Sequence, residues 1–189
     1  MGLAKPQLVT AEQALDWPDP EARFELVAGV VQPMTPAGGP HGAIIMTLAR
    51  ILGSHVHAHR LGALFSPDTG FLLRRRPDTV RCPDVAFVAA HRLPPGGVRR
   101  GFPELAPDLA VEVQSPTDRT RASWAKVAEY LGSGVREVWT IDPPARTVTV
   151  HGPDGTTRRL DEGDTLDAGD VVPDFRCAVA ELFEGVARE

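Results

Sequence analysis

The segments RCPDVAFV (residues 81–88) and PDLAVEVQSP (residues 107–116) decide the fold that this sequence predicts. Each contains an apolar run of strand length, and each carries one acid, Asp84 or Glu112, in or at the edge of that run. Side chains alternate between the two faces of a strand, so Glu112 lies on the face opposite Val111 and Val113. We therefore expect two strands that each present one carboxylate.

Outward from these segments, the sequence predicts further strands with helices before and after them. Thr10 and Gln13 form a capping box that opens a short helix, and apolar spacing from His41 to Arg60 predicts a longer one. We expect an α/β (α+β) fold over residues 1–189 as one domain: a mixed central sheet flanked by helices and extended by an N-terminal β-hairpin. The remaining expected elements are the hairpin FELV–VVQPM around Ala28-Gly29, the strands ALFSP, TGFLLR, EVWTID and TVTVHG, a helix from about Asp118 to Leu131, a loop over 161–170 and a short helix over 178–186.

Composition narrows the class of protein. Apolar residues make up 42% and charged residues 24%, as in globular proteins that are soluble. The two cysteines are far apart and lie in no CxxC motif, which argues against a zinc site or a disulfide framework and favours a cytoplasmic setting. The net charge of −5 argues against coating nucleic acid by bulk charge. No apolar stretch approaches the roughly 20 residues of a membrane helix.

The two strand acids suggest a metal site. A carboxylate on a buried strand is costly unless something compensates it, and a bound cation can do so. Mg²⁺ prefers oxygen ligands, often one or two carboxylates with waters. Without metal, the two carboxylates should repel, and the pKa of at least one should rise. A structural alternative remains open, in which Asp84 caps a turn after Pro83 and Glu112 pairs with an arginine.

Lys126 is the other residue with a chemical signal. Only two of the 20 basic residues are lysines, so a retained lysine invites a reason. Lys126 and Tyr130 are four residues apart and share one face of the predicted helix, while we expect an apolar stripe of Trp124, Val127, Ala128 and Leu131. A compact ammonium can orient water or stabilise developing charge, a role that arginine does not simply replace. The alternative is a solvated helix lysine.

The order and spacing of these motifs resemble the Uma-type family of predicted restriction endonucleases. The resemblance covers about Thr10 to Phe183, and its most specific pieces are PDVAFV, PDLAVEVQSP and the KxxxY helix followed by GVREVWTIDP. The family belongs to the PD-(D/E)XK nuclease superfamily. The resemblance implies hydrolysis of nucleic-acid phosphodiesters, with DNA favoured as substrate, Mg²⁺ as cofactor and Mn²⁺ as its substitute.

The resemblance also implies roles for individual residues. Asp84 and Glu112 become the metal-binding acids, and Val113 lends its backbone carbonyl. The superfamily's lysine position falls on Gln114, which could orient the attacking water by hydrogen bonding, while Lys126 takes over as the catalytic lysine.

Further residues follow from the same resemblance. His41 matches a histidine near the active site, where it could contact phosphate or tune the acids, or it is simply an exposed residue at a helix start. Glu25 matches a glutamate that assists with metal, whereas Ala28 replaces a second acid of that hairpin, which puts a second metal in doubt. Independently of the resemblance, Arg119 and Arg121 directly follow the Glu112 strand and are candidates for phosphate contact.

Two other functions remain open. Gln114, Ala28 and the negative net charge are also compatible with a catalytically inactive nuclease fold that binds nucleic acid or serves as an interaction module. A metal-dependent hydrolase of another phosphoester is a third reading. A homodimer would suit cleavage of two strands.

Overall fold

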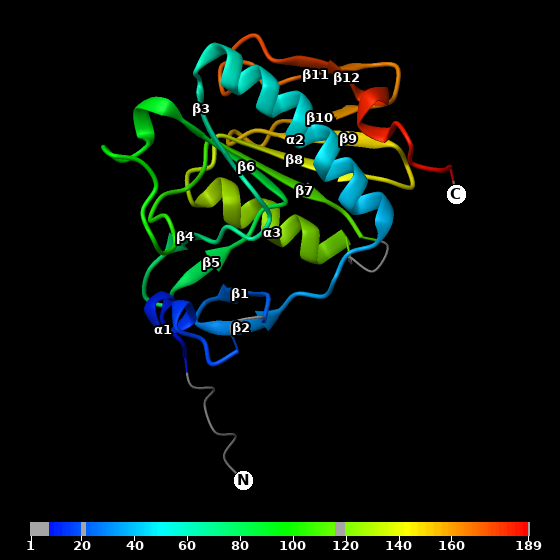
Figure 1. The fold of residues 1–189 in the computed structure, drawn as a ribbon. Helices are drawn as coiled ribbons and strands as arrows, with labels where there is room; N and C mark the ends of the chain where they lie inside the picture. The colour runs from blue at the N-terminus through cyan, green and yellow to red at the C-terminus, as the bar shows by residue number, and fades with distance from the viewer. Residues whose placement is uncertain (1–7, 20–21, 116–119, 189) are drawn as a thin grey trace.

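The computed structural model describes residues 8–19, 22–115 and 120–188, and its centre is a mixed six-stranded sheet (Figure 1). The strand order is β10-β9-β8-β7-β6-β3, in which β7 and β8 run parallel and the other neighbours are antiparallel. The strands are β3 (Gly62–Phe65), β6 (Val85–Ala89), β7 (Leu109–Val113), β8 (Glu137–Asp142), β9 (Thr147–His151) and β10 (Thr157–Leu160), and the long helices are α2 (Gly39–His59) and α3 (Thr120–Gly132).

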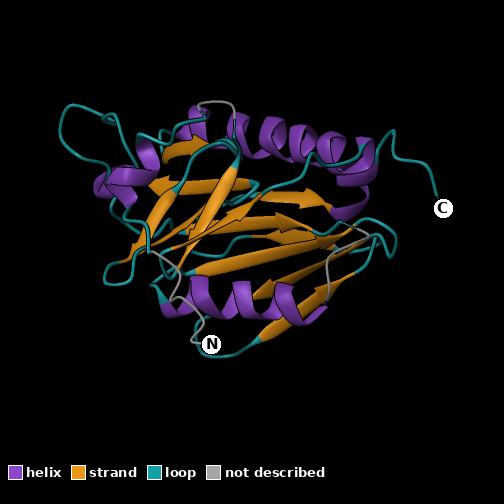
Figure 2. Cartoon of the chain, turned by 90° about the horizontal axis from the view of Figure 1, so that it is seen from below, coloured by secondary structure: helices purple, strands orange, loops and turns teal. Residues whose placement is uncertain are grey.

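The two long helices cover opposite faces of this sheet, as the view along the layers in Figure 2 shows. Val111 belongs to the apolar cluster that contains Leu48 of α2, whereas Ala110 belongs to the cluster that contains Val127 of α3. Alternation along β7 therefore turns Glu112 towards α3. This is the face on which the sequence places Lys126.

A smaller antiparallel sheet of order β2-β1-β5-β4 lies beside the central one. Its hairpin turns at Ala28 and Gly29, both with positive φ (49° and 78°), as a two-residue turn of a hairpin requires. Residue 81 ends β5 and residue 85 begins β6, so the chain passes directly from the small sheet into the central one. The remaining elements are α1 (Ala11–Leu15), β1 (Phe24–Val27), β2 (Val30–Pro33), β4 (Phe71–Arg74), β5 (Thr79–Arg81), β11 (Thr165–Asp167), β12 (Arg176–Ala178) and the 3₁₀ turns Ala90–Arg92 and Val179–Phe183.

Several local expectations need correction. The segment expected as an acidic loop, 161–170, contains β11, and neither β5, β10 nor β12 was predicted. Trp124 and Ala128 do not form part of an apolar stripe, because both are exposed while Val127 packs inward. The capping box of Thr10 and Gln13 is present.

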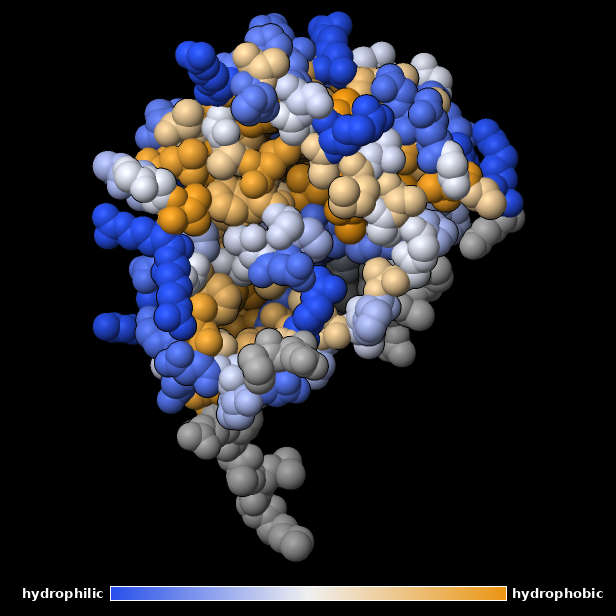
Figure 3. Space-filling model, viewed as in Figure 1, coloured by the Kyte–Doolittle hydropathy of each residue, from blue (hydrophilic) through white to orange (hydrophobic). Residues whose placement is uncertain are grey.

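The surface is hydrophobic in one area of the view in Figure 3, around the edge strand β3, with hydrophilic residues around it. An edge strand carries unpaired backbone groups to which a second chain can bind. The homodimer stays a prediction.

In the part of the chain that the structure describes, no helix combines the length and the hydrophobicity needed to cross a membrane.

Candidate active site

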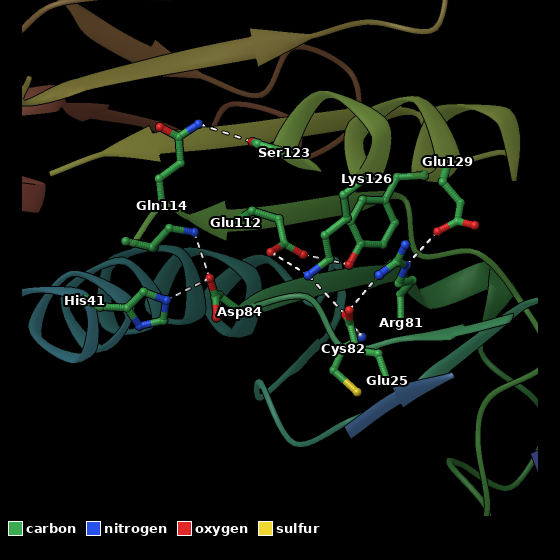
Figure 4. Close-up of polar contacts among 12 residues, drawn as sticks. Glu25, His41, Arg81, Cys82, Asp84, Glu112, Gln114, Ser123, Lys126 and Glu129 are labelled. Carbon is green, nitrogen blue, oxygen red and sulfur yellow. Dashed lines mark hydrogen bonds and ion pairs between the residues drawn. The ribbon is translucent and has the colours of Figure 1, made fainter. Parts of the chain in front are cut away.

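Glu112 lies on β7, and Asp84 immediately precedes the neighbouring strand β6 (Figure 4). Val85 of β6 pairs with Val111 of β7, which brings Asp84, one residue earlier, beside Glu112, one residue later. The Asp84 side chain is 11% exposed and that of Glu112 is 17% exposed, so both charges are largely removed from water. The two acids that the sequence singled out are therefore close together and mostly buried.

Lys126 bridges two buried glutamates. Its Nζ lies 2.8 Å from Glu112 Oε2 and 3.0 Å from Glu25 Oε1. Tyr130, four residues further along α3, donates its hydroxyl to Glu112 Oε1 at 2.7 Å. Because residues four apart share a helix face, α3 presents an ammonium and a hydroxyl to the same carboxylate. Lys126 is thus not a solvated helix lysine.

A second cation closes a ring of ion pairs around Lys126. Arg81 places Nη1 2.7 Å from Glu25 Oε2 and Nε 2.6 Å from Glu129 Oε2. Glu129 stands three residues after Lys126 on α3, so the ring returns to the helix on which it began. Glu25 also accepts a hydrogen bond from the backbone N–H of Cys82 at 3.0 Å. The ring ties β1, the end of β5 and α3 together around the site.

Asp84 has different partners. Its Oδ2 accepts a hydrogen bond from the backbone N–H of Val113 at 2.7 Å and lies 3.2 Å from His41 Nε2. His41 is the third residue of α2, so the start of that helix reaches the acids from the other side of the sheet (Figure 4). Gln114 donates from Nε2 to the hydroxyl of Ser123 at 3.2 Å, on the first turns of α3.

The charges in the site do not balance. Arg81 and Lys126 contact three carboxylates, and Asp84 is a fourth, so an excess of two negative charges remains when all of these groups are ionised and His41 is neutral. Burial is the main cause that raises the pKa of Glu112 to about 7, and the charges of Asp84 and Glu25 add to it against the attraction of Lys126. This is the rise expected for one of two carboxylates without metal.

The pKa values of Glu25 and Lys126 shift in the direction opposite to the one that burial alone would cause. Burial on its own would raise the pKa of Glu25, but the charges of Lys126 and Arg81 outweigh it and lower that pKa. Burial would likewise lower the pKa of Lys126, but Glu112 and Glu25 together raise it. Both therefore stay ionised at neutral pH.

The oxygen atoms around Asp84 are of the kind that binds Mg²⁺. The carboxylates of Asp84 and Glu112 and the backbone carbonyl of Val113 are hard oxygen ligands, and each carboxylate oxygen can accept more than one partner. Among residues 8–19, 22–115 and 120–188, no group of three or more His, Cys, Asp and Glu is arranged to hold a metal ion. A site of two carboxylates, one carbonyl and waters remains compatible with this finding.

The structure brings most of the predicted site residues together, although their roles stay predictions. Asp84, Glu112, Lys126 and Glu25 form one cluster, and His41 touches it through Asp84. Glu25 contacts cations here, so its part in holding a metal stays a prediction. Arg119 and the side chain of Arg121 lie outside the described residues.

Sequence reasoning missed the partners of Glu25. Arg81 and Glu129 were given no role, and the hydroxyl of Tyr130 was not paired with Glu112. One available signal was the position of Glu129, three residues after Lys126 on the same helix.

The comparisons with known proteins agree with this fold. A family model, Uma2, described as "Putative restriction endonuclease", matches residues 11–180. The chain belongs to this family. A crystal structure described as "a putative nuclease belonging to DUF820 from Anabaena variabilis ATCC 29413" superposes with a TM-score of 0.81 at 22% identity, over 93% of this chain and 98% of that one. It confirms the predicted fold class. The search of curated proteins gave no match.

Proposed function

We propose that this chain is a Mg²⁺-dependent endonuclease that hydrolyses phosphodiester bonds of nucleic acid, with DNA as the substrate. Membership of the Uma2 family supports it. The observation that carries it is the position of Lys126, which is largely buried against Glu112, the acid that lies beside Asp84.

In this proposal Asp84, Glu112 and the carbonyl of Val113 hold the metal. Mg²⁺ bound there supplies Lewis-acid polarisation of the phosphodiester and a water of lowered pKa. Lys126 keeps its proton at neutral pH, because Glu112 and Glu25 together raise its pKa against the effect of burial. It therefore acts as a donor that orients water and stabilises the growing negative charge, and it does not remove a proton.

Three further residues position this machinery. Glu25 holds Lys126 by its carboxylate and is itself held by Arg81. His41 contacts Asp84 and keeps that carboxylate oriented. Gln114 replaces the lysine of the superfamily motif, and its amide is close enough to Ser123 to be fixed beside the acids.

One observation favours a second candidate, a nucleic-acid-binding module without catalysis. Both oxygens of Glu112 already have partners, the ammonium of Lys126 and the hydroxyl of Tyr130. A carboxylate engaged in this way could be a purely structural buried ion pair. The two candidates differ in whether the protein cleaves nucleic acid when divalent metal is present.

Cleavage assays separate them. Plasmid and single-stranded DNA are incubated with Mg²⁺ or Mn²⁺, with and without chelator, and with the variants Asp84→Asn, Glu112→Gln and Lys126→Met. We expect metal-dependent cleavage by the wild type and by the control Glu184→Gln, an exposed acid outside the site, and none by the three site variants. Equal behaviour of all five proteins would refute the nuclease.

Metal binding gives a second, independent measurement. Mn²⁺ should raise the melting temperature of the wild type, since a ligand that binds the folded state stabilises it. Asp84→Asn should abolish the shift, and Glu184→Gln should keep it. A shift without cleavage would favour the binding module.

A further inference from the structure

A cavity of about 450 Å³ opens next to the candidate active site. It lies beyond the carboxyl ends of β7 and β8, the parallel pair, where Gln114 and Pro143 follow the two strands. The start of α2 and the C-terminal tail complete it, and Figure 1 shows these four segments meeting at the right of the molecule. In α/β sheets, ligands bind beyond the carboxyl ends of the strands.

The lining combines flat apolar surface with a few polar groups. Pro40, Pro143, Pro144 and Val186 supply the apolar part, and Gln114 and Ser115 supply hydrogen-bonding groups. The volume falls within the roughly 300–1,000 Å³ of ligand pockets. Such a lining suits a planar ring that stacks on one side and hydrogen-bonds at its edge.

One wall of the cavity is formed by Arg146, Glu162 and Arg188, whose side chains are held by mutual contacts. Arg146 donates to the carbonyls of Val186 and Phe183 and lies over the Phe183 ring at 4.9 Å, which fixes the tail against the turn between β8 and β9. Glu162 lies 2.7 Å from both Arg146 and Arg188. Two cations against one carboxylate leave this wall with one net positive charge, opposite in sign to the acidic side.

The cavity is continuous with the candidate active site. His41, whose ring contacts Asp84, and Gln114, the residue after Val113, both line it. We propose that this cavity receives one unpaired nucleotide next to the phosphodiester that is cut, with its base on the prolines and its phosphate towards Arg146 and Arg188. The inference rests on the proposed nuclease function, because the adjoining acids define which phosphodiester is cut.

The dimensions limit the substrate. The cavity has the volume for a single nucleotide, whereas a stacked duplex keeps its bases out of reach. Single-stranded nucleic acid, or a duplex with an unpaired nucleotide, therefore binds better than a fully paired duplex. Every base has a face that can pack on the prolines, so the cavity selects for unpaired structure more than for sequence.

Binding measurements test this without any cleavage. Fluorescence anisotropy in Ca²⁺ compares three labelled probes of the same length: a single strand, the same strand with abasic sugars, and the paired duplex. The abasic strand keeps its phosphates and loses only the bases. The wild type should bind the intact strand about tenfold more tightly than the abasic strand, the effect of burying the apolar face of one base.

Filling the cavity should remove this preference. Ala145 and Ala187 line the cavity and are exposed, so Ala145→Trp and Ala187→Trp add an indole there without disturbing the core. Ala58→Trp adds the same indole at the far end of α2, at another exposed alanine, and serves as the control. Both cavity variants should bind the intact and abasic strands alike, and Ala58→Trp should match the wild type.

The outcomes separate the two proposals. Equal binding of intact and abasic strands by the wild type, absence of binding, or an unchanged preference in both cavity variants would overturn the cavity assignment, whatever the cleavage assay shows. A base preference that the cavity variants lose, in a protein that cleaves nothing with Mn²⁺, would keep the cavity and refute the nuclease.

Discussion

The two strand acids lie in contrasting surroundings. Glu112 contacts the hydroxyl of Tyr130 and the ammonium of Lys126, which belongs to the ion-pair ring described above. Asp84 instead has one backbone N–H and the ring of His41, and His41 lines the open cavity. Glu112 therefore lies within a network of ion pairs, whereas Asp84 is linked through His41 to the cavity. The difference predicts that variants of the two sides fail in different ways.

The largest effect is expected at Asp84. Asp84→Asn should lower metal-dependent cleavage by about a thousandfold, since a lost metal ligand removes several kcal/mol of transition-state stabilisation. The free energy of unfolding without metal should change by no more than about 1 kcal/mol, because the amide oxygen can still accept from Val113. Urea unfolding and initial cleavage rates measure both. A large loss of stability with cleavage retained would contradict this prediction, because Asp84 would then matter for folding and not for cleavage.

Lys126→Met should fail through stability as well as activity. It leaves Glu112 and Glu25 buried without their shared cation, which costs about 3–5 kcal/mol. The melting temperature should fall by about 10 °C. The double variant Lys126→Met/Glu112→Gln should recover part of the loss, because one of the unpaired charges is gone. No recovery would show that the two side chains are not coupled.

The pH dependence of stability should report on Glu112. Its pKa is raised by burial to about 7 from an ordinary value of 4.5, so the folded protein binds this proton more tightly than the unfolded chain. The stabilisation is complete below pH 4.5 and is lost as the pH rises through 7, by about 3 kcal/mol.

The comparison that isolates this effect is with Glu112→Gln, which cannot ionise. The stability of the wild type relative to this variant, measured by urea unfolding with chelator present, should decline between pH 5 and pH 8. Saturating Mn²⁺ should reduce the decline, because the metal favours the ionised carboxylate. A difference that is flat with pH would mean that Glu112 is ionised throughout.

The smallest effect is expected at His41. His41→Gln keeps a side chain that can donate to Asp84, so cleavage should fall by about tenfold, the effect of one displaced hydrogen bond. The melting temperature should change little, since His41 lies in the first turn of α2 and is not among the buried residues of that helix. A loss as large as that of Asp84→Asn would give His41 a direct part in the reaction.

Much of the central arrangement could be predicted because it depends on local pattern. Two apolar segments placed Asp84 and Glu112 in or at the edge of strands, alternation gave the face of Glu112, and helical spacing placed Lys126 with Tyr130. The resemblance supplied Glu25 and His41, whose positions near the acids agree with the structure.

What could not be predicted depends on contacts between distant parts of the chain. Arg81 meets Glu25 from 56 residues away and Glu129 from 48 residues away, and no local pattern pairs them. The strands β5, β11 and β12 are three residues long, too short for a periodicity to be recognised. Trp124 was assigned to the core by its hydrophobicity, although only part of α3 packs on the sheet and this ring is exposed.

The most direct test of the proposed metal site is a crystal structure of the protein soaked in Mn²⁺, with the ion located by its anomalous signal. We predict one peak that contacts a carboxylate oxygen of Asp84, a carboxylate oxygen of Glu112 and the carbonyl of Val113, at about 2.0–2.2 Å, with Lys126 still beside Glu112. A crystal that shows no peak at these atoms, in a protein that is otherwise folded as described, would contradict the metal site and with it the nuclease.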